Sequence, residues 1–229
     1  MTILAIDTTS QWCSVAIFID KNNYFYQHEL IANTASQRLL DNVQAVLDQA
    51  QLRLEDISVF ACSQGPGAFT GIRLGIGVSQ GLAFAQGKSL IPIASLDGMV
   101  AYEWLMRPES FQSDSFMAAI DARMNQIYLC EYQQAKDELP VRTGPIYLQD
   151  NVEIRSSKES LLAFECSLYE PFMANFKHVT IGVPHALGIA YQASLINRHQ
   201  QFDPEDCQPL YVRDKVAKTT LERLQFTRP

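Results

Sequence analysis

The chain has 229 residues, of which 47% are hydrophobic and 19% are charged. These values are typical of folded proteins and argue against disordered, fibrous or low-complexity chains. The length predicts one large or two small domains that bury a core without disulfides or a structural metal. Lys and Arg number 18 against 25 Asp and Glu, a net charge of -7. Binding to nucleic acid would therefore need a local basic patch or a partner.

Hydropathy and cysteine usage predict a cytoplasmic protein with no membrane span. The longest apolar candidates, 72–85 and 187–196, are too short or interrupted to reach the roughly 18 to 20 residues of a span. Residues 1–7 contain no basic leader, unlike a secretory signal. The cysteines are scattered, with no CxxC and no histidine at ligand spacing, so we expect reduced, mostly buried thiols. They are Cys13, Cys62, Cys130, Cys166 and Cys207.

Hydrophobic periodicity predicts alternating strands and helices in the first part of the chain. Three apolar runs predict a strand meander, and apolar residues at spacings of three and four then predict an amphipathic helix from Ser36 to Ala50. A glycine-rich turn leads to Thr70, a good N-cap for a helix that runs to about Gln86, and Ser95 could cap a helix over Leu96–Leu105. The predicted strands are Ile3–Asp7, Val15–Asp20, Tyr24–Leu30, Ile57–Ser63 and Leu90–Ile93.

A polar connection between Met106 and Ser115 divides the chain into expected halves of residues 1–107 and 108–229. Both halves contain an apolar strand that ends in Ala-Ile-Asp, a polar turn and a second apolar strand, at 4–11 and 118–125. This similarity favours two halves built alike. The second half has weak periodicity over 136–176, and its predicted elements are strands Phe116–Asp121, Gln126–Tyr132 and Ile146–Leu148 and helix Leu187–Ile196.

Two turns in the first half could form a phosphate site. A strand-end carboxylate followed by hydroxyls, as in Asp7, Thr8 and Thr9, can hold a magnesium-bound phosphate. The backbone N–H groups of Gly65 and Gly67, before a helix, could seat an anion. The alternatives are a carboxylate that only forms its turn and a tight glycine turn. In the second half, Arg123 and Met124 follow the strand, and their bulk would fill a phosphate pocket.

Glycine recurs within the helix predicted after this turn, at Gly71, Gly75, Gly77 and Gly81. Four glycines cost about 3 to 4 kcal/mol of helix propensity relative to alanine, so close packing should offset them. Apolar residues on every side indicate a helix that meets another chain or domain; the alternative is a fully buried central helix. We expect Leu74, Val78, Gly81 and Leu82 to face the sheet. The expected partner or dimer interface comprises Phe69, Arg73, Ile76, Gly77, Gln80 and Phe84.

No catalytic or metal-binding pattern is present in the sequence. The four histidines are far apart and form neither HxxxH nor HExxH, and no GxSxG elbow occurs. We therefore predict no catalytic residue and no metal site in this chain.

The most specific patterns are ILAIDTT (3–9), QGPGAFTGIRLGIG (64–77), AIDARMNQIY (119–128) and PLYVRDKVA (209–217). Together they resemble the bacterial TsaB family of tRNA threonylcarbamoyladenosine biosynthesis subunits, also called YeaZ or glycoprotease-like. Two positions depart from the common family pattern: Ala35 stands where many members have histidine, and Ala68 where serine is common. We assign no polar role to either position.

The resemblance implies an α/β fold of the actin-like or sugar-kinase-like ATPase type, with two related halves and a degenerate nucleotide site. The tail from about residue 205 could return to the first half. The implied function is that of a non-catalytic scaffold subunit. Such a subunit binds and activates a TsaD-type catalytic subunit, together with a TsaE-type ATPase, to threonylcarbamoylate the adenosine next to the anticodon in tRNA.

Cofactors and partners follow from the same resemblance. ATP and metal are expected on the partner subunits, and none is required by this chain. In the catalytic relative, histidines on the helix after the first meander bind metal, whereas residues 36–50 contain none. Alone, the chain is expected to form a weak homodimer and to reach tRNA only through the complex. The tail 210–229 carries a local charge of +3 that could contact tRNA, the alternative being a solvated tail.

Two other functions stay open at this point. An active ATP-dependent kinase or ATPase of the same fold is supported by Asp7, Thr8 and Thr9 and opposed by Arg123 and Met124. A metal-dependent peptidase, which the older family name suggests, would need ligands that the sequence does not supply.

Overall fold

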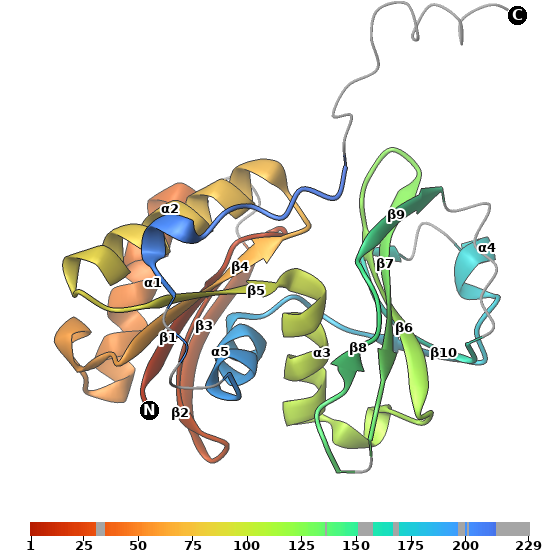
Figure 1. Cartoon of the computed structure of the whole chain (residues 1–229), viewed down its shortest axis with the longest axis horizontal. Coiled ribbons are helices and arrows are strands. Elements are labelled where there is room, and N and C mark those ends of the chain that lie inside the picture. Colours follow the sequence, from red (N-terminus) through yellow and green to blue (C-terminus); the bar gives the residue numbers. More distant parts are fainter. Residues whose placement is uncertain are drawn as a thin grey trace, which may run out of the picture.

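The computed structural model describes residues 1–30, 35–135, 137–150, 158–166, 170–196, 200 and 202–213. Two mixed sheets form its frame (Figure 1). The first has the order β3-β2-β1-β4-β5 and comprises β1 (Ile3–Asp7), β2 (Trp12–Asp20), β3 (Asn23–Leu30), β4 (Val59–Gly65) and β5 (Leu90–Ala94). The second has the order β11-β10-β6-β7-β8, with β9 also paired to β7. It comprises β6 (Ser115–Asp121), β7 (Gln126–Gln133), β8 (Val141–Arg142), β9 (Tyr147–Asp150), β10 (Ser160–Phe164) and β11 (His178–Ile181).

The two sheets repeat one topology. In the first, β1 pairs antiparallel with β2 and parallel with β4, which in turn pairs parallel with β5. In the second, β6 pairs antiparallel with β7 and parallel with β10, which pairs parallel with β11. The Ala-Ile-Asp strands are β1 and β6, so they hold equivalent central positions. The prediction of two related α/β halves is confirmed.

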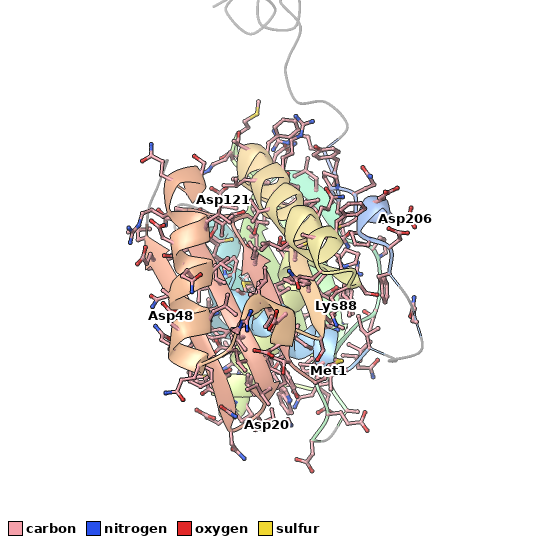
Figure 2. The ribbon with its side chains drawn as sticks, turned by 90° about the vertical axis from the view of Figure 1, so that its left-hand side faces the viewer. Met1, Asp20, Asp48, Lys88, Asp121 and Asp206 are labelled. Atoms are coloured by element: carbon pink, nitrogen blue, oxygen red, sulfur yellow. The ribbon has the colours of Figure 1, made fainter. Side chains whose placement is uncertain are left out.

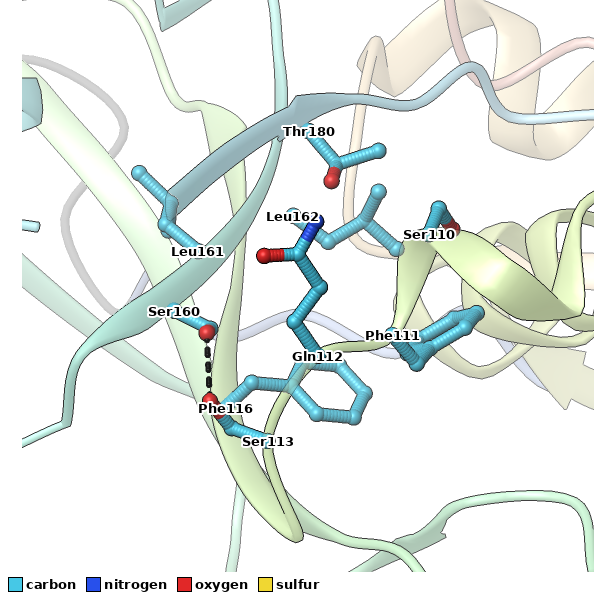
Figure 3. A pocket seen from close by; sticks show the side chains of 9 residues that line it. All are labelled: Ser110, Phe111, Gln112, Ser113, Phe116, Ser160, Leu161, Leu162 and Thr180. Atoms are coloured by element: carbon cyan, nitrogen blue, oxygen red, sulfur yellow. Dashed lines mark hydrogen bonds between the residues drawn. The ribbon is translucent and has the colours of Figure 1, made fainter. Parts of the chain in front are cut away.

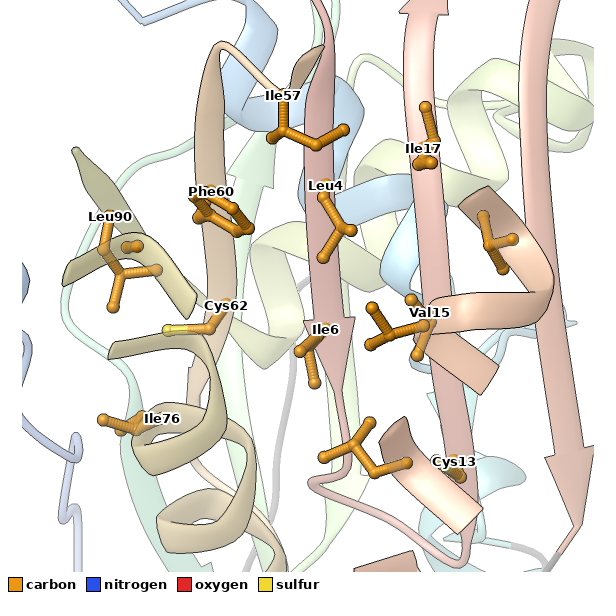
Figure 4. Close-up of a cluster of buried hydrophobic side chains, with 14 of the residues drawn as sticks. Leu4, Ile6, Cys13, Val15, Ile17, Ile57, Phe60, Cys62, Ile76 and Leu90 are labelled. Atoms are coloured by element: carbon orange, nitrogen blue, oxygen red, sulfur yellow. The ribbon is translucent and has the colours of Figure 1, made fainter. Parts of the chain in front are cut away.

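Helices cover both faces of the first sheet. On one face lie α1 (Ala35–Ala50) and α2 (Phe69–Ala85), seen side by side in Figure 2. On the other lie α3 (Ser95–Met106) and α5 (Ala186–Ser194). Alternate residues of β1 serve the two sides: Leu4 and Ile6 pack under α1 and α2 (Figure 4), and Ile3 and Ala5 pack toward α5. Because both faces are covered, the strand is a continuous apolar run.

Helix α3 lies between the two sheets. Its Ala101 belongs to the cluster on the first sheet, whereas Leu96, Met99 and Val100 join the cluster on the second. The far face of the second sheet is covered by α4 (Glu170–Met173), whose Phe172 packs there. The two sheets therefore share one helix.

Helix α5 shows that chain order and packing differ. Although it belongs to residues 108–229, it packs against β1, β2 and α3 of the first half. The close crossing of α3 and α5 depends on glycine, because a Cβ at Gly188 would collide with the carbonyl oxygen of Gly98.

The predicted cap residues are wrong, although both helices form. The N-cap of α2 is Ala68, and Thr70 lies inside the helix. The N-cap of α3 is Ala94, and the Ser95 hydroxyl bonds with Ser63 and Thr9 instead. At Ser95, buried partners therefore outweigh the usual capping preference. Within the part of the chain that the structure describes, no helix is long and apolar enough to cross a membrane.

Candidate functional site: the turns between the halves and the outer face of α2

Asp7 is buried at the end of β1 and organises the turn after it. Its Oδ1 accepts hydrogen bonds from the Thr9 N–H (2.9 Å) and the Thr9 hydroxyl (2.7 Å). Its Oδ2 is buried without a hydrogen-bond partner among the described residues. Burial raises the pKa of the Asp7 carboxyl, and the two bonds from Thr9 oppose that rise. The Asp7 carboxyl therefore stabilises the turn that follows β1.

A chain of buried hydroxyls ends at this carboxyl. Thr9 donates to Asp7 and accepts from the Ser95 hydroxyl at 3.3 Å. Ser95 in turn lies 2.9 Å from the Ser63 hydroxyl, which must donate because the Ser95 proton is already used. The chain links β4, α3 and the β1–β2 turn inside the protein, so these hydroxyls are committed to the fold.

The glycine-rich turn packs directly onto the Thr8–Thr9 turn. The Ala68 N–H donates to the Thr9 carbonyl at 2.6 Å, and the Thr8 hydroxyl donates to the Gly71 carbonyl at 2.7 Å. Gly71 permits this approach, because a Cβ there would collide with the Thr8 carbonyl oxygen. The Ala68 N–H at the start of the helix is therefore bound to protein and does not face an anion.

A cavity of about 340 Å³ lies between the two halves. Thr9 and Gly67 line it, whereas Asp7, Thr8 and Gly65 do not, so the structure places only two of the five expected phosphate-site residues at this cavity. The lining residues are Thr9, Ser10, Gln11, Gly67, Ala68, Ile120, Asp121, Ala122, Arg123, Tyr128, Phe164 and Glu165.

Arg123 forms ion pairs with two carboxylates on the second half's side of this cavity. Its guanidinium lies 3.5 Å from Asp121 Oδ2 and 3.4 Å from Glu165 Oε2. The backbone N–H of Arg123 donates to Asp121 Oδ1 at 2.8 Å, as the backbone N–H of Thr9 does to Asp7. Arg123, Met124 and Asn125 all have positive φ, so the second turn is tight but bulky. A large cation held by carboxylates replaces the small residues that a phosphate turn needs.

Residues 202–213 form a strap that crosses both halves, here called the C-terminal strap. The Leu90 N–H donates to Phe202 and the Leu210 N–H donates to Gln64. At its far end the Arg213 guanidinium donates to the Ala122 carbonyl at 2.8 Å. Figure 2 shows Asp206 of the strap beside α2. Residues 214–229 lie outside the described residues, so the role of the basic tail stays a prediction.

The outer face of α2 is open along one side. Phe84 is 71% exposed and Phe69 is 43% exposed. A Cβ added at Gly77 or at Gly81 would meet no atom within 4 Å. The expected inward position of Gly81 is wrong, because a step of four residues keeps it on the side of Gly77. Backbone along this face is accessible to another surface at close range.

Ile76 does not belong to this outer face, and its expected place there needs correction. It is 4% exposed and packs with Ile72 and Ala83 in the core beneath α2. Leu74, Val78 and Leu82 are partly buried against the same core. Helical geometry explains the difference, since the i, i+4 row through Ile72 and Ile76 is the one that faces the sheet.

The strap borders the same face and supplies a residue that the sequence pattern did not indicate. The Arg73 guanidinium lies 3.8 Å from the centre of the Phe69 ring, and its Nε–H donates to the Tyr211 hydroxyl at 2.9 Å. The Phe69 and Tyr211 rings stack at 5.5 Å. Gln80 donates to the Pro204 and Cys207 carbonyls. Tyr211 stands in the motif PLYVRDKVA, but no periodicity could place it beside α2.

His28 and His185 serve packing, whereas His178 is exposed on β11. His28 and His185 stack at 4.3 Å inside a column of rings closed by Trp12 and Tyr102. Burial lowers the pKa of His28 to about 4 and that of His185 to about 2. Over the described ranges, no group of three or more His, Cys, Asp or Glu could hold a metal ion. His199 lies outside them.

A small pocket near the link between the halves offers no ligand site. Ser110, Gln112 and Thr180 line a space of about 10 Å³, and a hydrogen bond of 2.7 Å joins the Ser113 and Ser160 hydroxyls (Figure 3). A space of this size is at the lower limit of what can hold one water molecule.

We predict that Asp7→Asn keeps the fold and raises stability at neutral pH. Asparagine retains the acceptor for Thr9 but removes a buried charge. Burial raises the pKa of Asp7 in the folded state. As the pH rises from the ordinary pKa of aspartate to this raised pKa, the wild type therefore loses about 1.4 kcal/mol of stability per pH unit. Thermal melts of both proteins should coincide at low pH and separate with the variant higher at pH 7.5. A variant that is less stable at pH 7.5 would contradict the buried-charge argument.

The repeated sheets with helices on their faces define an actin-like or sugar-kinase-like ATPase fold. The chain matches the family described as "TsaD: tRNA N6-adenosine threonylcarbamoyltransferase" over residues 28–161, more than half of its length. It belongs to this family, as a protein of the bacterial TsaB/YeaZ type.

Individual relatives agree with this assignment. The chain is 36% identical to the tRNA threonylcarbamoyladenosine biosynthesis protein TsaB of Haemophilus influenzae, over 59% of this chain and 56% of the relative. It is 40% identical to the Escherichia coli protein of the same name, over 58% and 56%. The match therefore spans little more than half the length of these relatives. The solved structure of YeaZ from Pseudomonas aeruginosa superposes with a TM-score of 0.78 and 27% identity, covering 92% of this chain and 99% of that one.

Proposed function

We propose that the chain takes part in tRNA threonylcarbamoyladenosine biosynthesis as a non-catalytic scaffold subunit that binds and activates a TsaD-type catalytic subunit. The names of the TsaB relatives support the pathway. The observation that carries the scaffold role is the outer face of α2, where two open glycines lie next to the exposed Phe84. Small residues flanked by an exposed aromatic ring suit close helix packing with another protein.

The closed turns support a non-catalytic role. The Ala68 N–H and the Thr8 hydroxyl bond to backbone carbonyls, and Asp7 is buried beneath Thr9. Arg123 and its two carboxylates line the cavity on the opposite side. In this proposal the chain requires no cofactor. ATP and metal act on the partner subunits, including a TsaE-type ATPase, and tRNA is reached through the complex.

The docking surface in this proposal is made of the exposed α2 residues together with the strap tyrosine. Without its partner, the face is covered by a second copy of the chain in a weak two-fold dimer, since an open apolar face tends to self-associate. The surface residues are Phe69, Arg73, Gly77, Gln80, Gly81, Phe84 and Tyr211, of which Gln80 also holds the strap.

Gly77→Leu tests the proposal. A leucine at this position would stand out from the helix, and we expect the affinity for a TsaD-type subunit to fall at least about 30-fold, or about 2 kcal/mol. Calorimetry with that subunit should show this loss of affinity, and sedimentation of the chain alone should show that the homodimer no longer forms. Gly144→Leu is the matched control, because Gly144 also has open space around it but lies in the second half.

Two outcomes would reject the proposal. If Gly77→Leu binds the catalytic subunit as tightly as the wild type, the interface lies elsewhere. If the chain alone hydrolyses ATP steadily and Asp7→Ala abolishes that activity, the kinase or ATPase alternative is correct.

A further inference from the structure

Two buried cysteines meet where the C-terminal strap crosses the first sheet. Cys62 on β4 and Cys207 on the strap are separated by 145 residues, and their Sγ atoms lie 3.4 Å apart. Both are free thiols within the core cluster beneath α2, where Figure 4 shows Cys62 near Phe60 and Ile76. The two thiols are therefore hydrogen-bonded to each other and are not covalently linked.

Hydrogen bonds to the backbone N–H and to the carbonyl of Cys207 hold this residue in position. The Cys207 N–H donates to the Pro204 carbonyl within a short 3₁₀ turn, Pro204–Asp206. The Cys207 carbonyl accepts from the Gln80 amide of α2 at 3.1 Å. Cys62 is fixed by the register of β4 between β1 and β5. The contact between the sulfurs is thus set by well-bonded backbone.

The other three cysteines lack such a contact. The Cys130 thiol approaches the carbonyls of Glu131 and Gly144, and the Cys166 thiol approaches that of Phe164. Cys13 packs in the core and its pKa is raised by burial to about 11. At the Cys62–Cys207 contact, the hydrogen bond between the thiols lowers the pKa of Cys207 and raises that of Cys62. This asymmetry favours Cys207 as the thiolate, which is the reactive form.

We propose that Cys62 and Cys207 form an oxidation site, at which hydrogen peroxide converts the two thiols into a disulfide that fastens the strap to β4. The Cys207 thiolate attacks one peroxide oxygen, the O–O bond breaks, and hydroxide leaves and takes up a proton to become water. Cys207 is then a sulfenic acid. The Cys62 sulfur attacks it, the S–S bond forms, the S–O bond breaks, and the Cys62 proton leaves with the hydroxyl as water. Two thiols lose two electrons and one peroxide becomes two waters.

The disulfide would act on the strap as a whole. Its other attachments to the two halves are noncovalent: hydrogen bonds, including Leu210 to Gln64 and Arg213 to Ala122, ring contacts and apolar packing. A covalent link at Cys207 would hold the middle of the strap against the sheet and constrain the unfolded chain across a long loop. A dithiol would reverse the link by exchange. This inference does not depend on any partner protein.

Peroxide treatment of the full chain tests the site. After hydrogen peroxide and then catalase, we expect titratable thiols in the denatured protein to fall from five to three. Non-reducing peptide mapping should yield one linked pair that contains Cys62 and Cys207. Hydrogen exchange of the Leu210 amide should slow at least about tenfold, and dithiothreitol should restore the original rate. Cys207→Ser should abolish the link, and Cys166→Ser should keep it.

Several results would overturn the proposal, and the wild-type protein alone is enough to obtain them. Five thiols that persist after peroxide, a link between other cysteines, or further oxidation of Cys207 without a link would each exclude the site. A Cys62–Cys207 link that leaves exchange at Leu210 unchanged would exclude fastening of the strap.

Discussion

Gly71→Ala is expected to lower the free energy of unfolding by about 3 kcal/mol or more, the upper end for overpacking a tight site. The added methyl group would collide with the carbonyl oxygen of Thr8, which belongs to the backbone and has no side-chain freedom to yield. The same movement would break the hydrogen bond from the Thr8 hydroxyl to the Gly71 carbonyl. The closed contact between the two turns would open.

Gly77→Ala is the matched control on the same helix. Its methyl group would meet no atom within 4 Å, so only helix propensity changes, and stability should rise by up to about 1 kcal/mol. Urea unfolding of the two variants should move the midpoint in opposite directions. If both substitutions shift the urea midpoint equally and in the same direction, the contact between the turns does not explain the need for glycine at position 71.

Acid is expected to unfold the protein through His185, the N-cap residue of α5. Its Nδ1 accepts the Leu187 N–H at 3.0 Å, and its ring is enclosed by His28, Tyr26 and Tyr102. Burial and the neighbouring His28 lower the pKa of His185 to about 2. Below about pH 6.5 the His185 imidazole binds a proton in the unfolded state but stays neutral in the folded state. His185 alone should therefore lower stability by about 1.4 kcal/mol per pH unit below that value, or about 3 kcal/mol by pH 4.5, and His28, whose pKa is also lowered, adds to this loss.

His185→Asn isolates this effect. Asparagine supplies an acceptor at the N-cap and has no proton to gain. Unfolding free energies of both proteins should be measured between pH 4.5 and 7.5, and the wild type should lose more stability toward acid than the variant. Parallel curves would show that other groups cause the acid sensitivity.

Local pattern was enough to predict the central strands and main helices. Ile3–Asp7 and Ser115–Asp121 are apolar runs that end in an aspartate whose carboxylate accepts the N–H two residues later. Such interactions span few residues, so the sequence carries them directly. The repeated Ala-Ile-Asp units therefore indicated two related halves. Residues 136–176 resisted prediction because most of the described elements there, such as β8 with two residues and α4 with four, are too short to show a period.

Contacts between distant segments could not be predicted in this way. The place of α5 under the first sheet, the hydroxyl chain through Ser95 and the pairing of Arg73 with Tyr211 all join residues far apart in sequence. On α2, periodicity identified Phe84, Gly77 and Arg73 as outward, but it misplaced Ile76 and Gly81. An apolar composition on all sides weakens the periodic signal from which a helix face is inferred.

The position of α3 between the two sheets has a mechanical consequence. Two-lobed enzymes open and close by swinging one lobe about a hinge of a few residues. Here such a swing would have to separate Met99 and Val100 from one lobe, or Ala101 from the other, and expose apolar surface. The strap also links the two lobes, because its Arg213 guanidinium donates to the Ala122 carbonyl. We therefore expect the two lobes to move together, with little change in the angle between them.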